Sequence, residues 1–324
     1  MSIDHRGRYG PHAPELTYLP HEFAEQRVDL GEVELNYATA GSAASPALLC
    51  IPGQTESWWG YEAAIPRLAE HFEVFAVDVR GQGRSTRTPG RYTLDNMGND
   101  LVRFIDQVIG RPVIVSGLSS GGVLTAWLCA YAKPGQVVAA CLEDPPLFSS
   151  EVRPAIAPGI RQAIGPMFDL WSTYLGPQWS IGAWDAMRAA APERLPAWLA
   201  GLPIPPEPRQ ELKEYDPEWG QAFWSGTVAA SCDHERMLAS ARVPHLLLTH
   251  HFRHVDEATG TLMGALTDAQ AARARALLEA AGVDVEYRSV PDVGHSMHGD
   301  APDRYVDILL DWVQAKGVAE AQRM

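Results

Sequence analysis

The chain has 324 residues, of which 46% are hydrophobic, and a formal net charge of −14. This size suffices for one large globular domain, or for a core with an inserted subdomain. The acidic balance disfavours nucleic-acid and anionic membrane partners, and no apolar run approaches the ~20 residues that span a bilayer. Residues 1–8 lack an apolar signal core, so we expect a cytoplasmic location.

Residues 1–26 combine histidines and prolines without a clear period. They indicate an N-terminal arm that packs on the body, contacts another subunit or stays mobile, which leaves a homodimer open. Strands and helices then alternate along residues 27–144, the first part of the predicted core. The expected elements are a hairpin over 28–40, strands 47–51, 73–79, 113–116 and 137–142, and helices 61–71 and 93–109.

Between residues 145 and 236 the alternation stops, and the chain holds six of its ten tryptophans between frequent prolines. We interpret this segment as an inserted helical cap. Alternation resumes over 237–324, the second part of the core, with strands 243–249 and 283–290 and helices 268–281 and 301–316. Together the two parts predict an α/β fold with a mostly parallel, eight-stranded sheet covered on both faces.

The centre of the predicted core is Gly117-Leu118-Ser119-Ser120-Gly121, a G-x-S-x-G pattern. A buried strand precedes it, and apolar residues at helical spacing follow it. Strand, tight turn with a central serine and helix form the context of a nucleophile elbow, in which flanking glycines let strand and helix pass closely. The pattern therefore predicts Ser119 as a nucleophile.

A serine hydroxyl needs a base to take its proton and an acid to orient that base. His295 lies in a loop between the last strand and the last helix, where this architecture places the base. His298 is its local competitor.

For the acid, the loop after the strand 137–142 offers Glu143 and Asp144, and the loop after Thr249 offers Asp256 farther from its strand. A rigid orienting partner close to a strand end favours Glu143 over Asp144, and both over Asp256.

The oxyanion of an acyl-transfer reaction needs N–H donors. We expect one from Ser120 at the start of the helix, and a second from Gly53 or Gln54, between which the sequence does not decide. His250, His251 and His254 match no metal-ligand spacing, so we expect no metal and no other cofactor.

These features together resemble the α/β-hydrolase superfamily from about residue 27 to 316. A closer likeness, to the zearalenone lactonases, is carried by Gly117–Gly121, Cys141–Glu143 and two cap motifs, Ala183–Met187 and Pro196–Pro203. The resemblance implies a glutamate acid after the sixth strand, which supports Glu143, and a cap tryptophan against the macrolactone, which corresponds to Trp198.

We therefore predict a Ser119–His295–Glu143 serine hydrolase that opens a macrocyclic lactone, zearalenone or a related resorcylic acid lactone, without a cofactor. Its partner is a small apolar ester in a pocket between core and cap, lined by Trp198, Trp184 and Trp58 or Trp59. The alternatives are a carboxylesterase or C–C hydrolase on the same scaffold, and a non-catalytic small-molecule receptor.

Overall fold

The computed structural model describes residues 20–154, 156–175 and 182–318. Most of the predicted N-terminal arm, residues 1–19, lies outside these ranges. The main strands are β1 (Glu25–Asp29), β2 (Glu34–Ala40), β3 (Ala47–Ile51), β4 (Glu73–Val77), β5 (Val113–Leu118), β6 (Val137–Glu143), β7 (His245–His250) and β10 (Asp284–Ser289).

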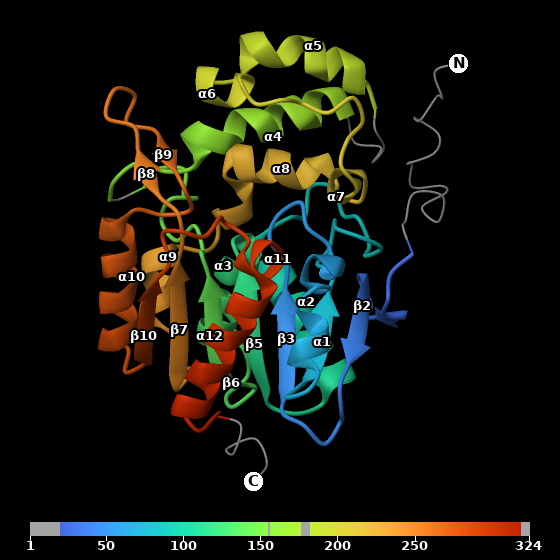
Figure 1. The fold of residues 1–324 in the computed structure, drawn as a ribbon, viewed down its shortest axis with the longest axis vertical. Coiled ribbons are helices and arrows are strands. Elements are labelled where there is room, and N and C mark those ends of the chain that lie inside the picture. Colours follow the sequence, from blue (N-terminus) through green and yellow to red (C-terminus); the bar gives the residue numbers. More distant parts are fainter. Residues whose placement is uncertain (1–19, 155, 176–181, 319–324) are drawn as a thin grey trace.

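These eight strands form one sheet in the order β1-β2-β4-β3-β5-β6-β7-β10 (Figure 1). The pairs β1–β2 and β2–β4 are antiparallel, and all the others are parallel. The predicted mostly parallel, eight-stranded sheet is confirmed. Its parallel strands share one carboxyl edge, which is where ligand sites form in open α/β sheets.

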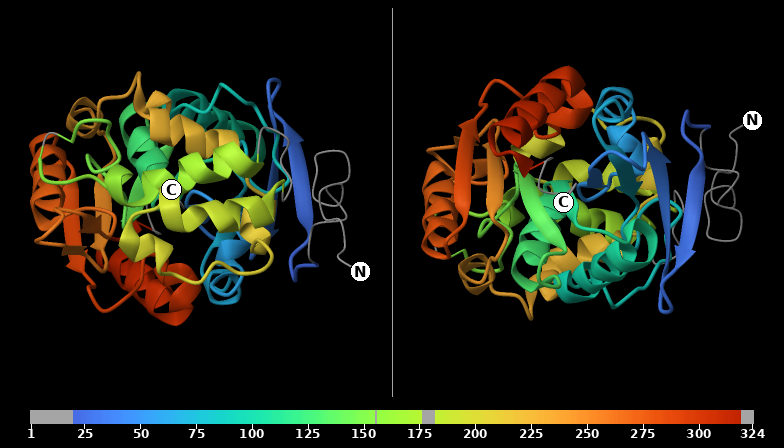
Figure 2. Two further views of the ribbon diagram at one scale, coloured as in Figure 1. Left: turned by 90° about the horizontal axis from the view of Figure 1, so that it is seen from above. Right: turned by 90° about the horizontal axis from the view of Figure 1, so that it is seen from below.

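Helices cover both faces of the sheet, and Figure 2 shows α1 and α12 on one side with α2 and α3 on the other. The first face carries α1 (Ile65–Leu68), α11 (Met297–Asp300) and α12 (Pro302–Ala315), and the second carries α2 (Leu94–Phe104), α3 (Ser120–Tyr131), α9 (His234–Ala239) and α10 (Asp268–Ala280). Because both faces are covered, β3 and β5 are buried along their whole length. β3 is apolar throughout, and β5 is apolar except for Ser116 and Gly117.

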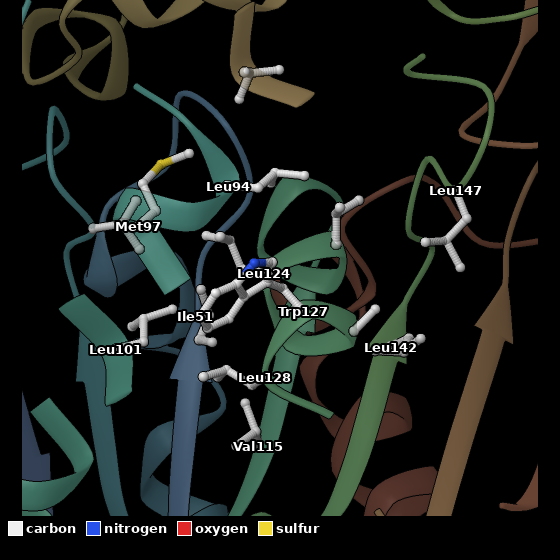
Figure 3. Packing of buried hydrophobic residues seen from close by; sticks show 14 of the residues in the cluster. Ile51, Leu94, Met97, Leu101, Val115, Leu124, Trp127, Leu128, Leu142 and Leu147 are labelled. Carbon is white, nitrogen blue, oxygen red and sulfur yellow. The ribbon is translucent and has the colours of Figure 1, made fainter. Parts of the chain in front are cut away.

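Alternate residues of a strand point to opposite faces, so each central strand contributes to two cores. In β3, Leu49 and Ile51 join the core beneath α2 and α3, and Leu48 and Cys50 join the core beneath α1 and α12. Figure 3 shows the first of these cores around Trp127 of α3. This packing fixes α3, and with it the turn that precedes the helix, against the sheet.

Between β6 and α9, the described part of the chain contains the α-helices α4 (Arg161–Leu175), α5 (Trp184–Arg194), α6 (Ala197–Ala200), α7 (Gln210–Lys213) and α8 (Pro217–Ser225). We call them the cap helices, because they lie over the carboxyl ends of the strands (Figure 1). Helical pieces are present here as expected, but two prolines lie inside helices rather than between them, Pro166 in α4 and Pro192 in α5. The domain boundaries at residues 145 and 236 stay a prediction.

Two local predictions need correction. The helix expected over 61–71 is shorter, because a 3-10 turn occupies Trp58–Tyr61 and the α-helical part is α1 alone. The stretch after β7 was expected to be a loop, but it contains the short pair β8 (His254–Val255) and β9 (Leu262–Met263). Within the described ranges, no helix has the length and apolar character that crossing a membrane requires.

Candidate active site

Ser119 lies in the turn between β5 and α3, with φ of 54° and ψ of −120°. A positive φ is strained for a residue with a side chain, and such strain persists only where the surroundings enforce it. Here the Ser119 N–H donates to the carbonyl oxygen of Glu143 at 2.8 Å, which ties the turn to the end of β6. The predicted elbow conformation is therefore present at Ser119.

The two flanking glycines are required by close approach of the backbone. A Cβ at Gly117 would collide with the carbonyl of Gly121, and one at Gly121 would collide with the carbonyl of Ile51 at the end of β3. Any larger residue at either position would push α3 away from the sheet and move Ser119.

His295 lies after β10, as predicted, and its Nδ1 is 2.6 Å from Oδ2 of Asp144. Asp144 is fully buried, and its Oδ1 also accepts the His251 N–H at 3.1 Å. An Nδ1–H that donates to a carboxylate leaves Nε2 as the basic nitrogen. His295 and Ser119 line the same cavity, although the described atoms include no hydrogen bond between them.

The prediction that Glu143 orients His295 is wrong in this geometry. The Glu143 carboxylate instead accepts the His298 backbone N–H at 3.0 Å, and its Oε2 lies 2.8 Å from Nδ1 of the same residue. Both side chains are fully buried, and the His298 ring stacks on Tyr61 with ring centroids 3.7 Å apart. The third candidate, Asp256, accepts hydrogen bonds from Thr259 within its own loop.

Strand parity explains why neighbouring acids contact different histidines. Glu143 is the last residue of β6 and shares the parity of Cys141, which faces the core beneath α1 and α12. That core contains α11, on which His298 lies. Asp144 leaves the strand with φ of 41°, so its side chain turns over the sheet edge to His295.

In each of the two histidine–carboxylate pairs, Asp144 with His295 and Glu143 with His298, the partners stabilise each other's charge. Partial loss of hydration opposes the charge of His295, but the hydrogen bond and negative charge of Asp144 outweigh it and hold the pKa of His295 above 6.5. Burial opposes the charge of Asp144, but the hydrogen bond from His295 holds the pKa of this carboxyl below its ordinary value. The pKa of Glu143 is likewise lowered, because His298 outweighs its burial.

The turn after β3 lies directly beside the nucleophile, because a Cβ on Gly53 would be 3.3 Å from Cβ of Ser119. Gly53 is nevertheless unsuited as an oxyanion donor, since its N–H already donates to Oε2 of Glu56 at 3.1 Å. The Gln54 N–H has no acceptor among the described residues. Ser120 begins α3, so its N–H has no intrahelical acceptor. Of the two predicted alternatives, the geometry therefore favours Gln54, together with Ser120.

These groups open into a cavity of about 330 Å³ beneath the cap helices. Its lining is mainly apolar and comes from α2, α3, the cap helices and the segment before α9. The members from α4 and α8 are Ile164, Met167, Phe168, Trp171, Trp219 and Phe223. A second cavity of about 390 Å³ adjoins it and shares Thr55, Met167, Trp171 and Leu199.

Of the four tryptophans that were predicted to line the pocket, one lines one of these two cavities and three line neither. Trp184 lines the adjoining cavity, and its Nε1 donates to the Pro205 carbonyl. Trp58 is fully buried and donates to Glu25, so it lines neither cavity. Trp59 donates to Glu214 and stacks on His21, and Trp198 packs on the core outside both linings.

Trp171, Trp219 and His251 are among the site residues that the sequence did not indicate. Trp171 and Trp219 line the cavity, because α4 and α8 turn these faces toward Ser119. His251 holds the base in place, since its Nδ1 lies 3.0 Å from the carbonyl oxygens of both Gly294 and His295. A signal for His251 was present: β6 and β7 are neighbours, so residues at their carboxyl ends meet at one edge.

The sequence matches the family described as "Alpha/beta hydrolase family" over residues 48–308. The chain belongs to the alpha/beta hydrolase family. Its predicted fold class is thereby confirmed, and the nucleophile elbow and the histidine after the last strand lie within the matched range.

Curated relatives align only in part. The chain is 32% identical to the bifunctional epoxide hydrolase 2 of Sus scrofa over 140 residues, which are 42% of this chain and 24% of that protein. It is 32% identical to the 3-oxoadipate enol-lactonase 2 of Acinetobacter baylyi over 102 residues, which are 31% of this chain and 38% of that protein. The chain thus spans less than half the length of these relatives.

Solved structures match over most of the chain. An enol-lactonase from Burkholderia xenovorans superposes with a TM-score of 0.61 at 17% identity, over 89% of this chain and 100% of that one. A hydrolase from Pseudomonas aeruginosa gives a TM-score of 0.62 at 19% identity, over 89% and 98%. At these identities the likeness establishes the fold alone.

Proposed function

We propose that this chain is a serine hydrolase of carboxylic esters, with Ser119 as nucleophile, His295 as base and Asp144 as orienting acid. One observation carries the proposal. A serine in a strained elbow shares a mainly apolar cavity with a histidine whose Nδ1 is held by a buried carboxylate 2.6 Å away. The names of the relatives, which include lactonases and epoxide hydrolases, support hydrolysis as the reaction class.

In the proposed acylation step, His295 Nε2 takes the proton of Ser119 as its Oγ attacks the ester carbonyl. Asp144 keeps the imidazole in the correct tautomer and stabilises the imidazolium. The N–H groups of Gln54 and Ser120 hold the oxyanion, and the amino-terminal end of α3 adds its dipole. His295 then gives the proton to the departing alkoxide, which leaves an acyl-serine.

In the second step, His295 Nε2 takes a proton from water, which attacks the acyl carbonyl. The tetrahedral intermediate uses the same two N–H groups, and its collapse returns the proton to Ser119 and releases the acid.

We propose a macrocyclic lactone of the zearalenone type as the substrate. The cap motifs Ala183–Met187 and Pro196–Pro203 support it by resemblance. The cavity supports it by size and polarity, because about 330 Å³ with mainly apolar walls falls in the range that holds a drug-sized ligand. The corrections at Glu143 and Trp198 remove two parts of that resemblance, so the substrate needs a direct assay.

That assay incubates the purified chain with zearalenone and follows the product by mass. Ring opening is expected to add one water, and heavy-oxygen water is expected to label the new carboxylate. Esters with an aryl leaving group and a β-diketone are run in parallel. Faster turnover of the aryl esters would favour a carboxylesterase, and turnover of the diketone alone would favour a C–C hydrolase.

The non-catalytic receptor is distinguished by a fluorophosphonate probe, which labels only an activated serine. We expect labelling at Ser119 and none in a Ser119→Ala variant. A wild-type chain that binds zearalenone but is neither labelled nor active would contradict the proposed function.

The pH profile tests the base. Only neutral imidazole accepts a proton, so kcat/KM is expected to rise with pH through a His295 pKa that lies above 6.5. Asp144→Asn removes the charge that raises this pKa, so the acidic limb is expected to move to lower pH. Rates are measured between about pH 5 and about pH 9 with a non-titrating ester. A limb that stays in place in the variant would contradict this assignment.

A further inference from the structure

One polar side chain in the wall of the main cavity has no part in the proposed reaction. His234 is the first residue of α9, is fully buried, and lines the cavity that contains Ser119 and His295. Most of its neighbours in the lining are apolar, among them Ile160, Val228 and Phe223. A histidine in such a wall needs an explanation, because burying a polar group without a partner is costly.

The protonation of His234 follows from its contacts. Its Nδ1 accepts the Phe148 N–H at 2.9 Å, so Nδ1 carries no proton. Burial lowers the pKa of His234 to about 4, against the raising effect of the Asp233 charge. The ring is therefore neutral near pH 7, and its one proton lies on Nε2.

This Nε2–H has no acceptor among the residues that the structure describes. Two other polar side chains of the lining are already bonded: the Gln54 amide donates to Tyr215, and the Ser150 hydroxyl donates to the Pro146 carbonyl. The Ser120 hydroxyl is also unpartnered, but it lies beside the nucleophile. His234 is thus a fixed donor in the wall, separate from the groups that act on the ester.

We propose that His234 is a specificity-determining residue whose Nε2–H binds an acceptor oxygen of the substrate other than the ester carbonyl. The inference rests on the proposed function, and it narrows the substrate class. A purely hydrocarbon ester would leave this donor unpaired, whereas a ketone, ether or hydroxyl oxygen at the right place in the chain would pair it. A site built to bond such a group discriminates against the analogue that lacks it.

The test is a series of p-nitrophenyl esters of one chain length, in which a ketone replaces one methylene at successive positions. For the wild type, we expect kcat/KM at one or two positions to exceed that of the unsubstituted ester by about tenfold, the size of one net hydrogen bond to a buried donor. A flat series in the wild type would overturn the proposal.

Two conservative variants separate recognition from folding. The side-chain amide of His234→Asn reaches the place of Nδ1 and can still accept the Phe148 N–H, but it puts no donor at the place of Nε2. His234→Gln does the reverse. We expect the ketone preference to be lost in the Asn variant and largely kept in the Gln variant. Preference that survives in Asn, or that follows thermal stability in both variants, would show a structural role only.

A binding measurement tests the recognition role of His234 separately from the proposed hydrolase function. The same series is titrated against Ser119→Ala, with Trp171 and Trp219 of the cavity wall as fluorescent reporters. If the wild type hydrolyses none of the esters, the proposed function fails, while a ketone preference in binding that His234→Asn abolishes still supports the recognition role. Equal binding of all members would overturn it whatever the activity.

Discussion

Replacing Ser119 with alanine is expected to lower kcat for ester hydrolysis by about 10⁴- to 10⁶-fold. The variant keeps the oxyanion N–H groups and the cavity, but it has no oxygen that can form the acyl intermediate. Alanine also fits the space of the serine side chain, so the elbow backbone at φ of 54° is expected to stay in place. Activity should therefore fall with little change in the free energy of unfolding.

Ser120→Ala is the matched control for this variant. It removes a hydroxyl one residue away but keeps the backbone N–H that the mechanism uses. We expect its kcat to stay within about tenfold of the wild type, since no proposed step involves its Oγ. Both variants are compared by initial rates on the best ester and by thermal unfolding. Equal losses in the two variants, or a Ser119→Ala rate within about tenfold of the wild type, would contradict the nucleophile assignment.

The sequence predicted the centre of the sheet well because the strands β3 and β5 are buried on both faces. Ala47–Ile51 is a continuous apolar run, and β5 begins with the apolar residues 113–115, so local pattern and tertiary environment agree. The elbow was equally predictable, because backbone contacts require both glycines: Gly117 lies against α3, and Gly121 lies against the end of β3. Where the sequence pattern and the packing agree in this way, a single sequence is enough to predict the element.

The acid was predicted wrongly because the side chains of adjacent residues at a strand end point in different directions, so each acid meets a different histidine. Placing the end of β6 one residue later than Leu142 turns Glu143 toward His298 and leaves Asp144 for His295. A spacing rule along the chain carries no information on which face each side chain takes. The sequence likewise did not decide between Gly53 and Gln54. The Gly53 N–H donates to the Glu56 side chain, and composition alone does not predict where that side chain lies.

The tryptophans of the cavity depended on how the cap helices turn. Trp171 and Trp219 face Ser119, whereas Trp198 packs elsewhere, and no periodicity in this proline-broken segment indicates which face is inward. Short helices take their orientation from packing against neighbours rather than from a long apolar stripe. The polar lining residue His234 was missed for a related reason, since the Phe148 N–H that its ring accepts is 86 residues away.

The second large effect is expected at Asp144. Asp144→Ala should lower kcat by about 10³- to 10⁴-fold, because His295 loses the partner that fixes its tautomer and stabilises its charge. Glu143→Ala is the matched comparison at the neighbouring position. It leaves His298 buried without its carboxylate, so we expect a loss of about 3–5 kcal/mol in the free energy of unfolding.

The two variants are therefore expected to affect different measured properties, activity in one and stability in the other, although the residues are adjacent. Activity per folded molecule should fall steeply at Asp144 and stay within about tenfold of the wild type at Glu143, whereas stability should fall more at Glu143. Glu143→Gln refines the comparison, because it keeps an acceptor for the His298 N–H while it removes the charge and replaces the second oxygen with an amide donor. If Glu143→Gln folded normally and lost more kcat than Asp144→Ala, the acid would be Glu143, and the hydrogen bond between Asp144 and His295 would not be the one that catalysis uses.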